Sequence, residues 1–221
     1  MYKSFVKRLL DIILSGFAIL AFAFPMLIVA LAIVIDDPGP VLFKQKRVGQ
    51  KKNGQITYFM IWKFRSMKMS TPHDVPTHLL ENPDQYITRV GKFIRKTSID
   101  ELPQIYQVFF GKLSVIGPRP ALWSQEDLIE ERERYGANDV KPGISGWAQI
   151  NGRDELEIPV KAKLDGEYTA AMNSGRFKGF LMDVRCFFGT FVSVLRSDGV
   201  VEGGTGEMKK QEGTAKETVS K

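Results

Sequence analysis

The longest apolar stretch of the chain lies near its beginning, where the 24 residues from Ile12 to Ile35 carry no charge. As a straight helix this stretch would be ~36 Å long, enough to cross a hydrocarbon layer of ~30 Å. Pro25 stands near its centre and predicts a kink, since proline cannot donate the helical hydrogen bond. Neither half is long enough to cross alone, so the pattern favours a helix-break-helix over residues 1–37.

Basic residues flank this stretch on both sides. Such residues mark the cytoplasmic side of a membrane, so the pattern favours a re-entrant segment that enters and leaves by the same face. A helix that spans the membrane remains the alternative, because proline is tolerated in such helices. A signal peptide is disfavoured, since further apolar residues follow the cleavage-like sequence at 21–23. The flanking cations are Lys3, Lys7 and Arg8 before the stretch, and Lys44, Lys46, Arg47, Lys51 and Lys52 after it.

The next pattern is that of a small β-hairpin near residues 41–62. Two segments rich in strand-forming residues surround Asn53-Gly54, a dipeptide typical of a type I′ turn. The cations on this hairpin either face anionic lipids or form a solvated basic surface.

Two adjacent carboxylates follow in the sequence Ser98-Ile99-Asp100-Glu101-Leu102-Pro103-Gln104. Ser98 and Glu101 have the spacing of a capping box, and apolar residues recur behind them at helical spacing, which predicts a helix start here. Pro103 falls just past the first turn, so this start could shift or bend. Asp100 and Glu101 either bind metal and attack a substrate or only complement the helix dipole.

Further candidate chemistry follows this helix. Arg119 stands between two prolines, which present its guanidinium on a stiff backbone suited to a phosphate. The glycine-rich segment 141–153 offers Trp147 and Arg153 beside a sharply bending backbone. Each of these motifs could instead be a structural turn.

Two further helices are expected. Residues 121–139 predict a solvated helix with ion pairs between its charged side chains. Residues 180–196 predict an amphipathic helix that lies on a membrane interface or on the core.

Composition narrows the classes of function. The 221 residues carry a net charge of +6, with the basic excess in the first third, which suits anionic lipids, phosphorylated substrates or nucleic acid. The single Cys186 excludes an internal disulfide and a zinc site built of several cysteines. Neither a dinucleotide-binding Gly-x-Gly-x-x-Gly nor a Walker A sequence is present.

Five landmarks, in one order, resemble the bacterial sugar transferases, which are monotopic polyprenol-phosphate phosphoglycosyl transferases. These landmarks are the broken apolar helix, Lys63-Phe64-Arg65-Ser66-Met67, the Asp100-Glu101 heptapeptide, Gly117-Pro118-Arg119-Pro120 and the segment 141–153. They cover about residues 3–200. Many members carry Ser-Pro at the membrane break, whereas this chain has Phe24-Pro25.

The resemblance implies an α+β fold that is mainly helical, with a re-entrant segment and interfacial amphipathic helices. It implies a cytoplasmic-face catalytic domain over 38–198 at the bacterial inner membrane, and composition predicts a disordered tail over 199–221. The implied reaction moves a sugar 1-phosphate from a UDP-sugar to undecaprenyl phosphate and releases UMP. Asp100 would be the nucleophile, and Glu101 beside it would help to hold Mg²⁺.

Other site residues follow from these expectations. Both substrates are phosphates, so cations are needed to offset repulsion at an anionic nucleophile. We assign this role to Arg95, Arg119 and Arg153, with Lys63 as a further candidate. Asp165 matches a substrate-site aspartate of the family, and Trp147 either lines the nucleotide pocket or braces its loop.

Two other classes of protein compete with the enzyme. A non-catalytic membrane-surface scaffold would use the same basic and apolar elements but would not need Asp100 and Arg119 together. A nucleic-acid binder is disfavoured, because the basic excess surrounds an apolar segment. The sequence does not identify the sugar, and it leaves open whether the protein forms a homo-oligomer.

Overall fold

The computed structural model describes residues 2–71, 83–152 and 156–196. The predicted tail over 199–221 and Arg153 therefore lie outside the described residues. Within the described part the fold is mainly helical with a small strand content, as expected. The helical elements are η1 (Tyr2–Val6), α1 (Lys7–Asp36), η3 (Pro83–Tyr86), α2 (Arg89–Lys96), η4 (Ile99–Glu101), α3 (Gln104–Phe109), α4 (Glu126–Arg134), η5 (Ala137–Asp139), α5 (Trp147–Ile150), α6 (Ile158–Asn173) and α7 (Arg176–Arg196).

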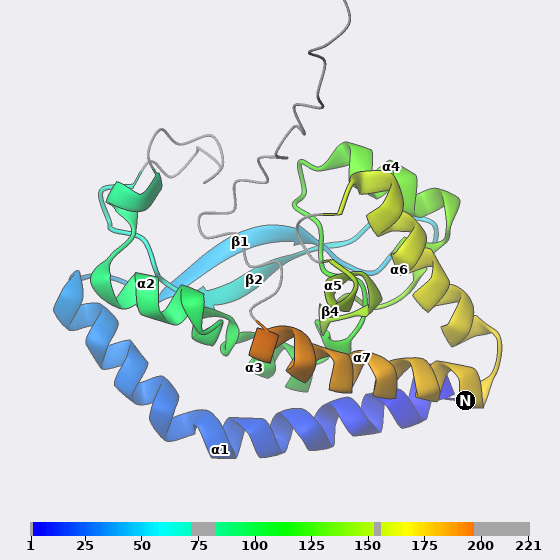
Figure 1. Ribbon diagram of the computed structural model, residues 1–221, viewed down its shortest axis with the longest axis horizontal. Coiled ribbons are helices and arrows are strands. Elements are labelled where there is room, and N and C mark those ends of the chain that lie inside the picture. Colours follow the sequence, from blue (N-terminus) through cyan, green and yellow to red (C-terminus); the bar gives the residue numbers. More distant parts are fainter. Residues whose placement is uncertain (1, 72–82, 153–155, 197–221) are drawn as a thin grey trace, which may run out of the picture.

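The apolar stretch forms the single long helix α1, which is long and apolar enough to cross a membrane. Pro25 lies inside this helix and does not interrupt it. Figure 1 shows that α1 bends in its middle part, as a missing helical hydrogen bond at proline would cause. The predicted kink is therefore present, whereas the predicted break into two helices is absent.

Both ends of α1 are bound to the same globular part of the molecule. At its start, Asp183 of α7 accepts hydrogen bonds from Tyr2 Oη (2.6 Å) and Lys7 Nζ (2.7 Å). Arg8 donates to the carbonyl oxygens of Val108 and Phe109, both at 2.6 Å.

At the other end, Asp36 Oδ2 accepts from Val90 N of α2 at 2.9 Å, and Asp37 forms an ion pair with Arg65. The long helix thus leaves the globular part and returns to it.

The predicted hairpin is confirmed. Strands β1 (Leu42–Val48) and β2 (Tyr58–Phe64) pair antiparallel, with Leu42 opposite Phe64 and Val48 opposite Tyr58. Asn53 and Gly54 have φ angles of 50° and 78°, as a type I′ turn requires.

A second, parallel pair joins β3 (Ser114–Ile116) to β4 (Gly143–Ser145). Glycine is required at this junction, because a Cβ on Gly143 would stand 2.1 Å from Gly117 N. Gly117 N donates to Ser145 O at 2.7 Å, and Gly143 N donates to Pro118 O at 2.9 Å. The loop that begins at Gly117 and carries Arg119 is therefore fixed against β4.

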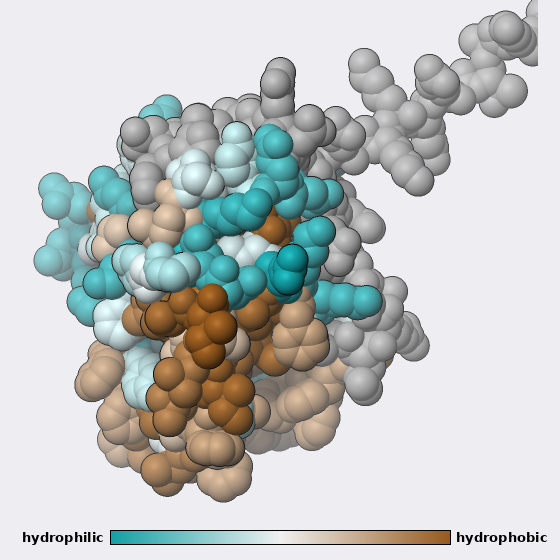
Figure 2. All heavy atoms as spheres, turned by 90° about the vertical axis from the view of Figure 1, so that its left-hand side faces the viewer, coloured by the Kyte–Doolittle hydropathy of each residue, from teal (hydrophilic) through white to brown (hydrophobic). Residues whose placement is uncertain are grey.

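The described part has a polar side and an apolar side. Figure 1 shows α7 running beside the first half of α1, and Figure 2 shows hydrophobic side chains gathered on the side that these helices form. The helix predicted over 180–196 is present within α7. One face packs on the core through the fully buried Cys186, and another leaves apolar side chains exposed; its position at a membrane interface stays a prediction. The exposed set includes Phe17, Leu20, Phe24 and Ile35 of α1, and Phe177, Phe188 and Phe191 of α7.

Candidate active site

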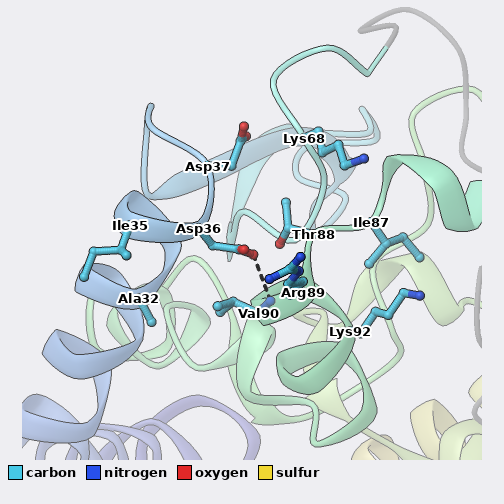
Figure 3. A pocket seen from close by; sticks show the side chains of 10 residues that line it. All are labelled: Ala32, Ile35, Asp36, Asp37, Lys68, Ile87, Thr88, Arg89, Val90 and Lys92. Atoms are coloured by element: carbon cyan, nitrogen blue, oxygen red, sulfur yellow. Dashed lines mark hydrogen bonds between the residues drawn. The ribbon is translucent and has the colours of Figure 1, made fainter.

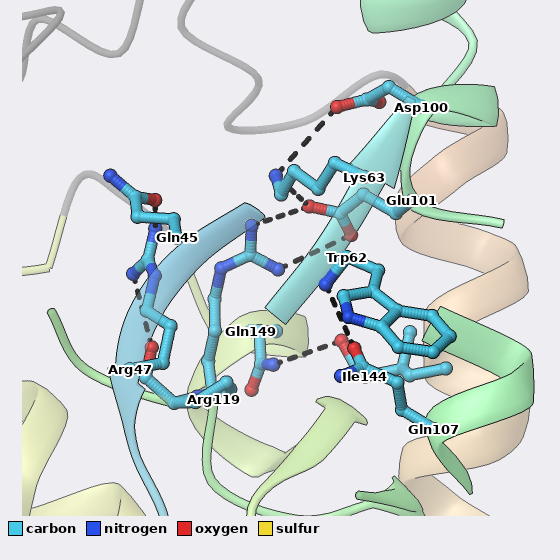
Figure 4. Close-up of polar contacts among 11 residues, drawn as sticks. Gln45, Arg47, Trp62, Lys63, Asp100, Glu101, Gln107, Arg119, Ile144 and Gln149 are labelled. Carbon is cyan, nitrogen blue, oxygen red and sulfur yellow. Dashed lines mark hydrogen bonds and ion pairs between the residues drawn. The ribbon is translucent and has the colours of Figure 1, made fainter. Parts of the chain in front are cut away.

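Four charged side chains from distant parts of the sequence lie close together near the start of α3. Lys63 stands near the end of β2, Asp100 and Glu101 lie on η4, and Arg119 lies on the loop after β3. Figure 4 shows Lys63 and Arg119 both reaching towards Glu101, with Asp100 beside them. The structure thus brings together four of the residues that the sequence singled out.

Glu101 is the carboxylate that these cations hold. Lys63 Nζ lies 2.8 Å from Glu101 Oε1, and Arg119 donates to both of its oxygens at 2.7 and 3.4 Å. Burial alone would raise the pKa of Glu101, but the charges and hydrogen bonds of Arg119 and Lys63 outweigh it and hold the pKa well below its usual range. Glu101 is therefore ionised and fixed in position.

Asp100 is held much more loosely. Its nearest cation is Lys63, with Nζ 3.7 Å from Oδ2, beyond hydrogen-bonding distance. Burial raises the pKa of Asp100, and the negative charge of Glu101 adds to this effect, while Lys63, Arg95 and Arg119 oppose it. Two neighbouring carboxylates thus have pKa values shifted in opposite directions, an arrangement that enzymes use to give similar groups different tasks.

The backbone that carries this pair differs from the predicted helix start. Ser98 has a left-handed conformation (φ 56°), and its side chain caps nothing. The predicted capping box is therefore wrong: η4 is a separate 3₁₀ turn, and α3 begins at Gln104 after Pro103. The proline forbids a helical N–H bond at this point, so the helix starts after the carboxylates rather than at them.

Two arginines outside the predicted site hold the Arg119 loop by its carbonyl groups. Arg132 Nη2 of α4 donates to Arg119 O at 3.0 Å, and Arg47 Nη1 of β1 donates to Pro120 O at 3.1 Å. The sequence had placed Arg47 on a lipid-facing or solvated surface and Arg132 on a solvated helix. Arg132 is in fact buried, at 3% exposed, and its position three residues after the apolar Ile129 gave no signal of this role.

Asp165 lies behind this loop and does not face Asp100. Its side chain is fully buried and accepts from Arg132 at 2.6 and 2.9 Å. Burial raises the pKa of Asp165, against the opposing charge and hydrogen bonds of Arg132. The structure thus connects Asp165 to the site through Arg132 and the backbone of Arg119, and the substrate-site role that the family resemblance implied for Asp165 stays a prediction.

The remaining predicted residues surround this cluster. Arg95 stands in the last turn of α2, close enough to lower the pKa of Asp100. Trp147 packs against the core residues around Ile116 and Tyr168, and its Nε1 donates to Glu167 at 3.0 Å. These contacts are those of a bracing residue, and a role of Trp147 in nucleotide binding stays a prediction.

Comparison with known proteins identifies the family of this chain. A family model described as bacterial sugar transferase matches residues 2–197. The chain belongs to the bacterial sugar transferase family. It is 41% identical over 170 residues to the UDP-glucose:undecaprenyl-phosphate glucose-1-phosphate transferase of Escherichia coli K12, which covers 74% of this chain and 36% of that protein.

Two further relatives differ in length. The UDP-N-acetylgalactosamine-undecaprenyl-phosphate N-acetylgalactosaminephosphotransferase of Aeromonas hydrophila is 42% identical over 203 residues, covering 89% of this chain and 45% of that protein. The uncharacterized sugar transferase EpsL of Bacillus subtilis is 36% identical over 196 residues, covering 88% and 90%. The chain thus spans about a third of the first of these relatives and nearly all of the last.

The carboxylates of this bacterial sugar transferase suit a hard cation. Mg²⁺ takes oxygen ligands, and in phosphate chemistry it is commonly held by one or two carboxylates together with substrate phosphates. Asp100 and Glu101 provide that number of carboxylates. No group of three or more acidic, histidine or cysteine side chains that could hold a metal occurs in the described residues. A metal here would therefore depend on the substrate for part of its coordination.

Proposed function

We propose that the protein transfers a sugar 1-phosphate from a UDP-sugar to undecaprenyl phosphate, giving a polyprenyl diphosphosugar and UMP. The observation that carries this proposal is the division of labour between two adjacent carboxylates. Glu101 is fixed by Lys63 and Arg119, while Asp100 has no hydrogen bond to its carboxylate among the described residues. Phosphoryl transfer through a covalent intermediate needs one such group to attack and fixed charges to receive the phosphate.

In the proposed reaction Asp100 acts as the nucleophile. A carboxylate oxygen of Asp100 forms a bond to the phosphorus next to the sugar, and the bond from that phosphorus to the bridging oxygen of UMP breaks. UMP leaves with that electron pair, and the sugar phosphate remains on Asp100 as an acyl phosphate. A phosphate oxygen of undecaprenyl phosphate then attacks the same phosphorus and releases the Asp100 carboxylate.

The surrounding cations make this reaction feasible. An anionic nucleophile meets an anionic phosphate, so the guanidinium of Arg119 and the ammonium of Lys63 offset the repulsion. Mg²⁺, when bound at Asp100 and Glu101, would supply further charge neutralisation. The Asp100 side chain is only 13% exposed, so burial keeps solvent from most of its carboxylate. This exclusion of water limits hydrolysis of the acyl phosphate.

The membrane arrangement is part of the same proposal. Both ends of α1 bind one globular part, which supports a re-entrant helix that enters and leaves the membrane on the cytoplasmic side. The exposed apolar face of α7, next to α1, would lie in the interface of the inner membrane. This arrangement would bring undecaprenyl phosphate to Asp100 from the bilayer.

The covalent step gives the decisive experiment. The purified protein is incubated with a panel of UDP-sugars and Mg²⁺ but without undecaprenyl phosphate. We expect a burst of UMP no larger than the amount of enzyme, a mass increase of one sugar phosphate and a label on Asp100. Undecaprenyl phosphate should then discharge the adduct.

Two variants complete this experiment. Asp100→Asn should give neither burst nor adduct, because a neutral amide is a poor nucleophile, whereas Glu130→Gln, on an exposed side chain of α4, should behave as the wild type. Turnover that proceeds only through a ternary complex, with no adduct after rapid quenching, would reject the covalent mechanism. Absence of UMP release with every UDP-sugar would favour a non-catalytic scaffold.

The re-entrant path is tested by labelling. Single cysteines replace Ser4 and Lys52 in a Cys186→Ser background, and intact cells are treated with a membrane-impermeant thiol reagent. We expect both positions to be protected. Labelling at one position and not at the other would mean that α1 spans the membrane. Pro25→Ala should shift molecules towards a spanning helix, because it restores a straight helix.

A further inference from the structure

A cavity lies near the start of α2, whereas the Asp100 cluster lies beyond the other end of this helix. It has a volume of about 950 Å³ and is formed where the last turn of α1 meets the first turn of α2. Figure 3 shows Ala32 and Ile35 of α1 on one side and Lys68, Ile87 and Lys92 on the other. Arg89, at the start of α2, lines this cavity, whereas Arg95, which acts on Asp100, lies about 9 Å further along the helix axis.

Three cations line this cavity: Lys68, Arg89 and Lys92. All three side chains are exposed, and no ion pair joins any of them to an acidic group among the described residues. Within the described residues, these three cations are therefore available to an anionic ligand.

The cavity also contains two acidic residues, and both already have partners. Asp36 Oδ2 accepts from Val90 N at 2.9 Å. Asp37 pairs with Arg65 and accepts from Met69 N at 2.9 Å. Val90 N, near the start of α2, is thus already bound to Asp36, and Gly91 N donates to Thr88 Oγ1 at 2.8 Å, so a ligand would be recognised mainly by side chains.

The opposite wall is apolar and continuous with the exposed side of α1. Ile35 is 81% exposed, and Leu31 and Val34 just before it are also exposed. In the membrane arrangement proposed above, this end of α1 is where the helix leaves the hydrocarbon layer. The cavity would then lie at the depth of the lipid head groups, with its apolar wall towards the acyl chains.

We infer that this cavity binds the phosphate head group of an anionic membrane phospholipid that is not a substrate. Cations set beside an apolar wall match a phosphate joined to acyl chains. An acceptor lipid whose phosphate meets Asp100 cannot place that phosphate here as well. The inference rests on the proposed membrane location of α1, but not on the proposed chemistry of Asp100.

The experiment measures lipid retention and thermal stability of the detergent-purified protein. Phosphatidylglycerol should remain bound as one molecule per chain in native mass spectra and raise Tm by about 5 °C at saturating lipid. Phosphatidylcholine should do neither. Inorganic phosphate at millimolar concentration should not replace the lipid, since it lacks acyl chains. Equal stabilisation by inorganic phosphate would show a site for free anions and overturn the lipid assignment.

A matched pair of variants locates the effect. The triple variant Lys68→Gln, Arg89→Gln and Lys92→Gln should weaken phosphatidylglycerol binding by about tenfold or more. The control, Lys44→Gln, Lys46→Gln and Lys52→Gln, removes the same charge from exposed hairpin positions and should bind as the wild type does. Equal loss in both would mean general electrostatic attraction and would refute a defined site.

UMP release separates this inference from the proposed function. The cavity variant should still form the Asp100 adduct with a UDP-sugar, since its changes lie outside the catalytic cluster. If undecaprenyl phosphate displaces phosphatidylglycerol from the wild type at equal concentration, the cavity belongs to the acceptor and the inference is wrong. If no UDP-sugar reacts but phosphatidylglycerol is still retained, the proposed function fails while the lipid site stands.

Discussion

Two of the clusters that pair carboxylates with arginine, around Glu101 and around Asp165, differ in access to solvent. In the first, Glu101 binds Lys63 and Arg119, whose side chains are 20% and 38% exposed. In the second, Asp165 binds Arg132, and these side chains are 0% and 4% exposed. The first cluster also has Asp100 and Arg95, whereas the second is a closed pair.

This difference separates a site that can take a ligand from one that supports it. An accessible guanidinium beside a loosely held carboxylate can meet a phosphate and form new bonds. A sealed pair cannot change partners without leaving a buried charge uncompensated. The two clusters are nevertheless connected, because Arg132 donates to the backbone of Arg119. We therefore expect the sealed pair to support the proposed reaction by fixing the position of the accessible cluster.

The largest expected effect comes from the accessible cluster. Asp100→Asn should lower turnover by about 10⁴-fold or more, as loss of a nucleophile does. It should leave the free energy of unfolding unchanged or slightly higher at neutral pH, because burial raises the pKa of Asp100 and so opposes its ionisation in the folded state. UMP release and chemical denaturation measure the two quantities. A large loss of stability would show that Asp100 has a structural role.

A change in the sealed pair should act mainly on the free energy of unfolding, whereas Asp100→Asn should act mainly on turnover. Arg132→Met leaves Asp165 buried without its cation and should cost about 3–5 kcal/mol of unfolding free energy. The double variant Arg132→Met and Asp165→Leu should recover most of that stability, because no buried charge is left.

Activity distinguishes support from substrate contact. The double variant should remain at least tenfold less active, since the hydrogen bond from Arg132 to Arg119 O is lost, and the loss should appear in kcat more than in KM. Full recovery of activity along with stability would mean that the pair does not position Arg119.

A smaller effect on activity is expected from Arg47, which holds the Arg119 loop at Pro120. Arg47→Met removes the bond to Pro120 O at 3.1 Å and should lower kcat/KM by about tenfold, the range of one hydrogen bond to a charged group. Lys44→Met, three positions earlier on β1 with an exposed side chain on the opposite face of the strand, is the control and should have little effect. If the two variants lose activity equally, the hairpin supports the site through its overall charge and not through this bond.

The smallest effect concerns pH. Because the pKa of Asp100 is raised, kcat/KM should increase with pH through a value above 3.8, where the carboxylate ionises. Glu101 has a lowered pKa, so the stability it contributes is present above its unfolded pKa and is lost only as pH falls through the much lower folded value. Glu101→Gln should therefore flatten the acid side of the stability profile. Asp100→Asn should not.

Local sequence was enough to predict part of this structure. Asn53 and Gly54 define the hairpin turn by their own conformational preferences, and the uncharged stretch 12–35 defines the long helix by composition. Asp100, Glu101, Lys63 and Arg119 were also identified, but mainly from resemblance to a family rather than from the chemistry of each motif.

Contacts between distant residues could not be predicted in this way. Arg132 lies in a stretch dense with charge, and only its partner 33 residues later shows that it is buried. Ser98 fits the pattern of a helix cap, yet its left-handed backbone turns the chain before α3 begins. For Arg132, packing between separate elements overrides the local preference that the sequence displays, whereas for Ser98 the nearby Pro103 moves the helix start.

The bond between Tyr2 and Asp183 joins residues 181 positions apart, so it has a consequence for the order of biosynthesis. At about 5–20 residues per second, roughly 10 to 40 s pass between synthesis of the two partners. During that interval the first helix can enter the bilayer, but its starting end has no α7 to hold it. The helix therefore reaches its final position only after α7 has been translated.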